Sequence, residues 1–206
     1  MRFVLCLLLW LTLPAAAVAG DLVVSVRTPQ GAPVADAVVT VAAPHSGPIR
    51  FPWPYRMAQH HLQFDPFVLV VPVGADVAFP NLDPVRHQVY SFSPAKTFEL
   101  KLYGRDETRV VRFDKPGVVA VGCNIHDNMV AFILVVETPY AAKTDALGMA
   151  VIHGAPAGAQ AVRVWRPYLR ARDNALTQTA QVPRDGQVRL TFTGDVRPPP
   201  EHHMMY

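Results

Sequence analysis

The stretch Val121-Gly122-Cys123-Asn124-Ile125-His126-Asp127-Asn128-Met129-Val130 decides how the rest of the chain is interpreted. It places a thiol, an imidazole and a thioether three residues apart, on a predicted short loop between two strands. A lone cysteine between strands is usually a small buried hydrophobe, and one histidine or methionine alone is usually packing or surface. With a second histidine, however, the three make the Cys-His-His set with a weak axial thioether that is typical of electron-transfer copper sites.

The second histidine is expected to be His87, which stands where a loop, 82–86, meets a predicted strand, 89–92. Mixed sulfur and nitrogen ligands suit copper because the cuprous ion prefers soft sulfur and the cupric ion prefers imidazole. Little then has to move when an electron arrives. Met129 is the expected axial ligand; the alternative is that its thioether lies away from the metal and leaves three ligands.

The first 19 residues are predicted to be a secretory signal peptide. Arg2 precedes a short apolar run, and the small residues Ala17-Val18-Ala19 follow Pro14. The run is too short for a membrane span. Removal of this segment takes Cys6 with it and leaves Cys123 as the single thiol of an exported, periplasmic chain. Metal ligation would protect such a thiol in an oxidising compartment.

The remaining chain, about 187 residues, is predicted to be all-β, because it combines many prolines, of twenty in the full sequence, with strand-like apolar runs and no convincing helical period. The net charge of +3 is small and scattered, which argues against nucleic acid as a partner. Hydrolase motifs and phosphate-binding glycine loops are absent from the sequence. Two-copper sites and thiol redox chemistry need a second cysteine.

The two ends of the chain resemble two halves of one module. The segment 20–45, with GAPVADAVVTV, and the segment 139–195, with TDALG, PAG and VRVW, are similar to a carboxypeptidase-regulatory-like, transthyretin-type β-sandwich. The segment 46–138 would be a second domain inserted into that sandwich, or packed beside it. Insertion is tolerable where chain ends lie close together on a surface. Residues 196–206 are expected to form a flexible tail.

The middle segment resembles the cupredoxins, the small blue copper proteins that include plastocyanin and amicyanin. The spacings Cys123-x2-His126-x2-Met129 and Asn81-x5-His87, and the approach from Phe113 through Pro116-Gly117 to Cys123, carry the likeness. The whole order is similar to chains labelled methylamine utilization proteins. The resemblance implies a Greek-key sandwich with one type 1 copper ion, held by His87, Cys123 and His126, with Met129 axial.

By the same resemblance Asn81 would support the site, its amide and backbone tying the two ligand loops together. Read alone, it is equally a turn residue after Pro80. The sequence departs from the family in two places: Val119 replaces a common aromatic residue, and Asp127-Asn128 replaces the proline-bearing loop of amicyanin. The loop around His126 is therefore expected to be more polar, which leaves the identity of the electron partner open.

The sequence thus predicts a non-enzymatic protein that transfers single electrons between redox partners, such as a c-type cytochrome and a periplasmic dehydrogenase. The alternative is a copper carrier or a binding module, suggested by the tail residues His202, His203, Met204 and Met205. A further pair, His60 and His61, is expected to lie on a strand. Adjacent side chains would then point to opposite faces and could not chelate one ion.

Overall fold

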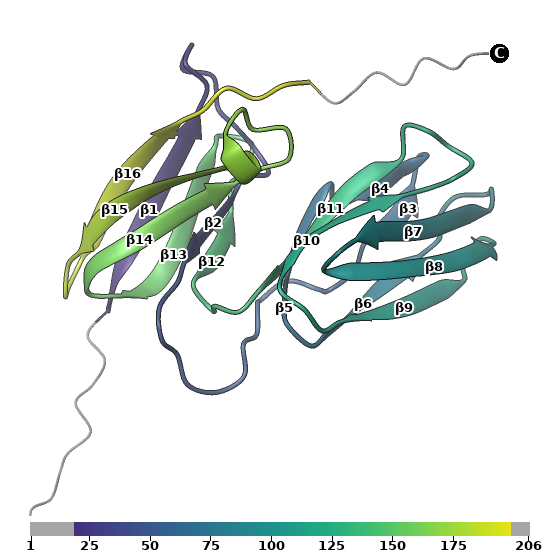
Figure 1. Ribbon diagram of the computed structural model, residues 1–206, viewed down its shortest axis with the longest axis horizontal. Helices are drawn as coiled ribbons and strands as arrows, with labels where there is room; N and C mark the ends of the chain where they lie inside the picture. The colour runs from purple at the N-terminus through teal and green to yellow at the C-terminus, as the bar shows by residue number, and fades with distance from the viewer. Residues whose placement is uncertain (1–18, 199–206) are drawn as a thin grey trace, which may run out of the picture.

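The computed structural model describes residues 19–198, and they are built almost wholly of β-strands (Figure 1). One 3₁₀ turn, Arg172–Asn174, is the exception among the regular elements of these residues. The all-β prediction is confirmed. Among the described residues, no helix has the length and apolarity needed to cross a membrane. The strands form two β-sandwiches that lie side by side (Figure 1).

The first sandwich, here called the split sandwich, combines strands from both ends of the chain. One sheet has the order β13-β1-β16 and the other has the order β12-β2-β14-β15. Its strands are β1 (Ala19–Arg27), β2 (Val38–Val41), β12 (Ala141–Lys143), β13 (Met149–Pro156), β14 (Gly158–Trp165), β15 (Ala175–Val182) and β16 (Gln187–Thr193). A buried core of valine, alanine, leucine, isoleucine and phenylalanine lies between the sheets. Strand β1 therefore pairs with strands more than a hundred residues away in the sequence.

The Thr144-Asp145-Ala-Leu-Gly148 turn joins the two halves of the split sandwich. The Thr144 hydroxyl donates to the Val34 carbonyl and accepts from the Ala37 amide. Gly148 has φ +72°, and a Cβ on it would lie 2.5 Å from the carbonyl oxygen of Val26. Only glycine fits this close approach without strain. The TDALG turn therefore holds together two segments that are distant along the chain.

The second sandwich, here called the inserted sandwich, contains the residues between β2 and β12. Its main sheet has the order β5-β11-β10-β7-β8, and two-stranded sheets β6-β9 and β3-β4 complete it. Its strands are β3 (Ala58–His60), β4 (Gln63–Asp65), β5 (Val68–Pro72), β6 (Ala75–Pro80), β7 (His87–Ser93), β8 (Lys96–Tyr103), β9 (Thr108–Phe113), β10 (Gly117–Gly122) and β11 (Val130–Val136). Strand β5 is parallel to β11, whereas β10 is antiparallel to both of its neighbours.

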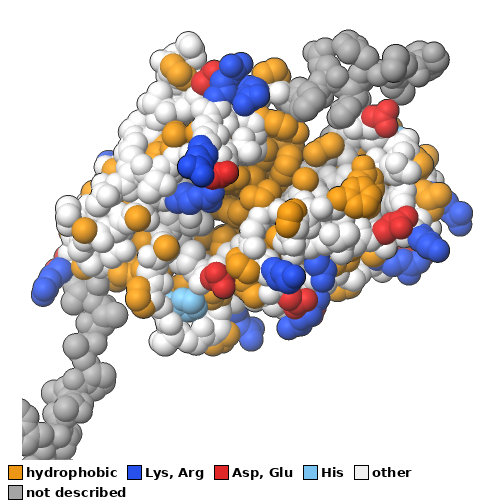
Figure 2. Space-filling view, in the orientation of Figure 1, with side chains coloured by type: hydrophobic (Ala, Val, Ile, Leu, Met, Phe, Trp, Pro, Cys, Tyr) orange, Lys and Arg blue, Asp and Glu red, His pale blue; other side chains and the backbone are white. Residues whose placement is uncertain are grey.

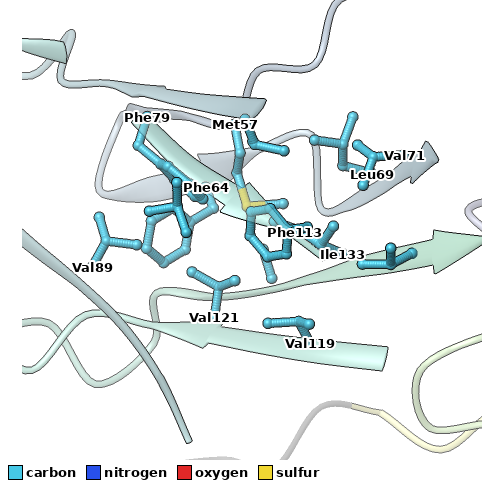
Figure 3. Packing of buried hydrophobic residues seen from close by; sticks show 14 of the residues in the cluster. Met57, Phe64, Leu69, Val71, Phe79, Val89, Phe113, Val119, Val121 and Ile133 are labelled. Atoms are coloured by element: carbon cyan, nitrogen blue, oxygen red, sulfur yellow. The ribbon is translucent and has the colours of Figure 1, made fainter. Parts of the chain in front are cut away.

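The core of the inserted sandwich holds large apolar side chains that point toward one another from both layers (Figure 3). Phe79 and Phe113 come from β6 and β9, and Val121 and Ile133 face them from the main sheet. Cys123 and Met129 belong to the same buried cluster. Each fully buried side chain of this kind stabilises a fold by about 1.5–3 kcal/mol. The two sulfur residues of the ligand hairpin are therefore anchored in the core.

The two sandwiches share a third apolar cluster, which explains the unbroken apolar run of β5. Leu69 and Val71 point into the inserted sandwich, whereas Val68 and Val70 pack with Trp165 of the split sandwich. Strand β5 is consequently buried on both faces, which favours a continuous apolar sequence over an alternating one. Val38 and Ala141 of the split sandwich contribute to the same contact.

The chain remains attached to the split sandwich beyond β16. Val196 forms a bridge with Leu169, and the Arg197 amide donates to the Tyr168 carbonyl. The tail residues that could offer copper ligands, His202, His203, Met204 and Met205, lie outside the described residues, as do Cys6 and most of the predicted signal peptide.

Candidate metal centre

The hairpin between β10 and β11 positions Cys123 and His126. Cys123 is the first residue after β10, and its amide donates to the Met129 carbonyl over 3.2 Å. The Met129 amide in turn donates to the His126 carbonyl over 2.9 Å. These two bonds close the loop on itself. The loop is therefore a compact turn at the end of two strands that are paired along their whole length.

His87 reaches the same place from a different strand. It begins β7 and lies opposite Tyr103 of β8, and the register between these strands shifts between His87 and Val89. Such an irregularity re-aims a side chain at the end of a ladder. The His87 side chain is fully buried, which is unusual for histidine and indicates that its polar atoms have partners.

The structure brings His87, Cys123 and His126 together. The Sγ atom of Cys123 lies 3.9 Å from Nδ1 of His87 and 3.7 Å from Nδ1 of His126. All three donor atoms lie within 4.8 Å of one another, and no other group of three such side chains meets this test within residues 19–198. Cys123 is buried and His126 is partly exposed.

These distances fit a shared metal ion. Bonds of about 2.0 Å to imidazole and about 2.3 Å to thiolate, held about 120° apart on one ion, separate nitrogen from sulfur by roughly 3.7 Å. The same nitrogen, Nδ1, faces the sulfur in both histidines. The donor set of one thiolate and two imidazoles suits a copper ion that changes oxidation state.

Asp83 is a site residue that the sequence analysis missed. Its buried carboxylate accepts a 2.8 Å hydrogen bond from Nε2 of His87, and bonds of 2.7 and 3.0 Å from the backbone amides of His61 and Leu62. Burial alone would raise the pKa of Asp83, but the Leu62, His87 and His61 bonds outweigh it, and the pKa is lowered. An ionised carboxylate at Nε2 keeps the proton there and leaves Nδ1 free as a ligand.

The only sequence signal for Asp83 was its place four residues before His87, in a loop that also contains Pro84. Such a loop aspartate is ordinarily solvated, and nothing local distinguishes this one. Its role depends on the turn after β3, which comes from a segment about twenty residues earlier.

Asn81 is fully buried and holds the loop that leads to His87. Its side-chain amide donates to the carbonyls of Val85, at 2.8 Å, and Tyr103, at 3.2 Å, and its Oδ1 accepts from the Asp83 amide. Its backbone pairs with Asp106 and Glu107. These contacts fix the position of the His87 loop relative to β8 and the β8–β9 turn. A contact between Asn81 and the Cys123 loop stays a prediction.

Met129 lies at the end of the ligand hairpin and is buried, at 1% exposure, in the same cluster as Cys123. Its backbone closes the loop, as described above. Its placement in the core beside the cysteine is compatible with an axial role and equally with packing. Coordination by its sulfur therefore stays a prediction.

The expectation for His60 and His61 was wrong about their geometry. His60 ends β3, but His61 and Leu62 have φ of +54° and +55° and form a tight turn into β4. The two imidazole rings stack, with centroids 3.8 Å apart. In such a turn, neighbouring side chains do not point to opposite faces as they do in a strand. Asp83 stabilises the turn by accepting hydrogen bonds from the amides of His61 and Leu62. Both rings are exposed, and they are not part of the metal cluster.

Comparisons with known proteins give partial structural likenesses. No family model matches the chain, and no curated protein matches it. The copper-containing nitrite reductase NirK from Thermus scotoductus SA-01 is 27% identical, with a TM-score of 0.39 over 48% of this chain and 26% of that one. A purple cupredoxin from Nitrosopumilus maritimus is 22% identical, with a TM-score of 0.36 over 39% of this chain and 98% of that one. A reduced mutant of amicyanin is 16% identical, with a TM-score of 0.38 over 48% and 98%.

Each of these likenesses covers less than half of this chain, and the chain spans only about a quarter of the nitrite reductase.

Proposed function

We propose that this chain is an exported, periplasmic protein that binds one type 1 copper ion and transfers single electrons between redox partners. The ligands would be His87, Cys123 and His126, with Met129 axial. The observation that carries the proposal is the convergence, within 4.8 Å, of one buried thiol and two Nδ1 atoms: Cys123 and His126 come from the loop between β10 and β11, and His87 comes from β7. Copper bound there would gain and lose one electron without a change of ligands.

The chain's own residues account for the rigidity that such a site needs. Asp83 fixes the His87 ring, and Asn81 fixes the loop that delivers it. The backbone bonds of Met129 fix the loop of Cys123 and His126. Because the ligands are held in place by the fold, little reorganisation would accompany a change of charge, and partners that support ligands in this way commonly set metal affinity.

The two histidines have different roles in this proposal. His87 is buried and tied to Asp83, so it holds the ion from inside. His126 is partly exposed at the tip of the hairpin and offers an edge to a partner. The partners would be redox proteins, such as a c-type cytochrome or a periplasmic dehydrogenase. The protein would not be an enzyme, because four protein ligands leave no open position for a substrate.

The carrier alternative is disfavoured by burial. A protein that delivers copper needs ligands that can be exchanged, whereas Cys123 and His87 are buried, at 4% and 0% exposure, and His87 is held by a buried carboxylate. Easy loss of copper to a chelator, without electron exchange, would favour the carrier function.

The test is the visible and electron-spin-resonance spectrum of the mature protein after addition of cupric ion. An intense blue thiolate-to-copper band with small parallel hyperfine splitting is expected, and Cys123→Ser should abolish it. A control variant, Ser46→Ala in the loop after β2, should leave it unchanged. A pale spectrum with ordinary splitting in the parent would overturn the proposal, because copper would then be bound elsewhere.

A further inference from the structure

The junction between the two sandwiches is apolar at the surface as well as inside. Val68 and Val70 of β5 pack with Trp165 across it, and Figure 2 shows apolar side chains gathered in the hollow between the two halves of the molecule, on the face that it draws. Two hollows of about 480 Å³ each are lined by residues of both sandwiches. This volume is in the range of small-molecule sites, roughly 300–1,000 Å³.

The two hollows differ in charge. One is lined by both Glu137 and Arg163, so that its charges balance. The other, here called the junction pocket, is lined by Arg56 and Lys143 and by no acidic side chain, and its remaining residues are all apolar. None of them is one of the proposed copper ligands. The junction pocket is therefore a separate site whose charge favours an anion.

Three sheet edges meet at the junction pocket. Strand β5 is an edge of the main sheet of the inserted sandwich, and β12 and β13 are edges of the two sheets of the split sandwich. Such edges ordinarily attract further strands. Here, however, Nζ of Lys143 donates to the Val68 carbonyl over 3.1 Å, and Nε1 of Trp53 donates to the Val70 carbonyl over 2.8 Å. Because these carbonyls are already occupied, the pocket suits a small molecule better than an added peptide strand.

The donors that remain for a ligand are Arg56 and the edge of β5. The Lys143 ammonium is paired with the Asp36 carboxylate at 2.9 Å. The exposed Arg56 side chain forms no ion pair or hydrogen bond with any residue from 19 to 198. The amides of Val68 and Val70 lie on the same edge as their carbonyls, because both backbone groups of a strand residue point the same way. A ligand with acceptor oxygens would match these donors.

Ring-shaped side chains form one wall of the junction pocket. The Trp53 indole stacks on Phe51, with ring centroids 4.6 Å apart and planes within 3° of parallel. Pro54 and Pro66 line the pocket beside Trp53. Flat rings pack well against such surfaces, and aromatic pairs add to the energy of apolar burial. The wall therefore favours a flat apolar body over a flexible chain.

We propose that the junction pocket binds a small organic acid with a flat apolar body, which places its acidic group at Arg56 and its ring against Trp53. Such a molecule contacts both sandwiches at once, because β5 belongs to one of them and β12 and β13 belong to the other. Binding to the folded chain then raises its thermal stability by mass action. No covalent or redox step is involved, and the inference does not depend on copper.

The probes are two fluorescent dyes, anilinonaphthalene sulfonate and phenylnaphthylamine, which share one ring system and differ by the sulfonate. Each is titrated into the full chain, with and without cuprous ion. We expect the sulfonate dye to bind more tightly than the neutral dye, to raise Tm, and to bind equally in both metal states. Amide signals of Val70 and Val151 should shift on binding, and that of Gly122 beside the metal centre should not.

Arg56→Gln and Val151→Glu test the recognition of the acidic group. Arg56→Gln should weaken binding of the sulfonate dye by about two- to fivefold, the range of an exposed ion pair, and leave the neutral dye unaffected. Val151 lines the pocket at 40% exposure, so Val151→Glu should fold and repel the sulfonate dye. The matched controls are Arg189→Gln, an exposed arginine of β16, and Val110→Glu, a 59% exposed valine of β9. Both should bind the dyes as the parent does.

Four results would overturn the inference. Neither dye binds the parent; or both bind equally and Arg56→Gln changes nothing, so that the pocket does not recognise an acid. Decanoate, an acid on a flexible chain, displaces the sulfonate dye at a lower concentration than naphthoate does, so that the occupant is lipid-like. Sedimentation shows dimers in the parent and monomers in Val151→Glu, so that the pocket belongs to an interface with a second copy of this chain.

Discussion

Replacement of Asp83 by asparagine is the sharpest test of how the metal centre is held. Residue Asp83 is only 3% exposed, and its carboxylate accepts three hydrogen bonds, from His87 and from the amides of His61 and Leu62. Asparagine has the same shape but offers one acceptor oxygen and one NH₂ group. In Asp83→Asn, at least one of the three donors must therefore face another donor.

The expected loss of stability follows from the number of donors left without an acceptor. Loss of one bond to a charged, buried acceptor costs about 1.5–3 kcal/mol, and the donor left unpaired costs a similar amount. We expect the metal-free variant to lose about 3 kcal/mol in its free energy of unfolding, which lowers Tm by roughly 6–12 °C for a chain of this size. Copper affinity should fall by about 10- to 100-fold, because the His87 ring loses the group that fixes its orientation.

Thermal unfolding of the metal-free protein and chelator competition for copper measure the two effects separately. Asp106→Asn is the matched control: it lies in the same sandwich, its side chain is 83% exposed, and its pairing with Arg105 at 3.9 Å is worth little. If Asp83→Asn matches the parent in both assays, Asp83 is not the residue that positions His87, and the argument for a preorganised site loses its main support.

Three further substitutions have defined outcomes. Met129→Leu conserves volume and should change the free energy of unfolding by less than about 1.5 kcal/mol, yet it should alter the visible spectrum if the thioether coordinates; an unchanged spectrum would leave a three-ligand site. Tyr103→Phe should cost about 1 kcal/mol at pH 7, because the Phe79 carbonyl loses its donor. Burial raises the pKa of Tyr103. The parent's free energy of unfolding should therefore fall as pH rises above about 10, where this tyrosine ionises in the unfolded chain. Urea unfolding should show a smaller fall in Tyr103→Phe. Gly148→Ala should lower the free energy of unfolding by at least about 2 kcal/mol, because alanine is strained at positive φ and its Cβ would approach the Val26 carbonyl. An unchanged midpoint of urea unfolding would show that this turn does not hold the two halves of the split sandwich together.

Local pattern was enough to predict the all-β class and to single out His87, Cys123 and His126, which the structure brings together. The predicted strand 89–92 lies within β7, and the predicted short loop around Cys123 lies between β10 and β11. The spacing of Cys123 and His126 predicted a hairpin tip because both strands beside it are apolar and bounded by turn residues. Strand β15, Ala175–Val182, was not predicted, because its alanine, threonine and glutamine residues carry little apolar signal.

What sequence could not show depends on contacts between distant segments. Asp83 is buried and paired because the turn after β3 folds back onto it. His61 belongs to that turn, and its amide donates to Asp83, so it does not have strand geometry. Likewise, the apolar run of β5 predicts that the strand is buried, but it does not predict which residues cover it. The covering residue Trp165 lies about a hundred residues later in the sequence. Pairing of this kind is set by tertiary packing and leaves no periodic trace in one segment.

The split sandwich makes physical sense as a support for the ligand hairpin. Strand β11 leads directly out of the loop that holds Cys123 and His126, and from Ile133 onward it is buried on both faces, because Leu134 and Val136 pack with Trp165 on its outward side. A strand closed on both sides has less freedom to twist or slip than one open to water. The covering stops before Tyr90 and Gly122, so the rigidity is imposed on the strand behind the site while the surface nearest the thiol stays open. The split sandwich therefore packs against the strand that leaves the ligand hairpin, and it does not cover Ala120 and Gly122 of β10 beside Cys123.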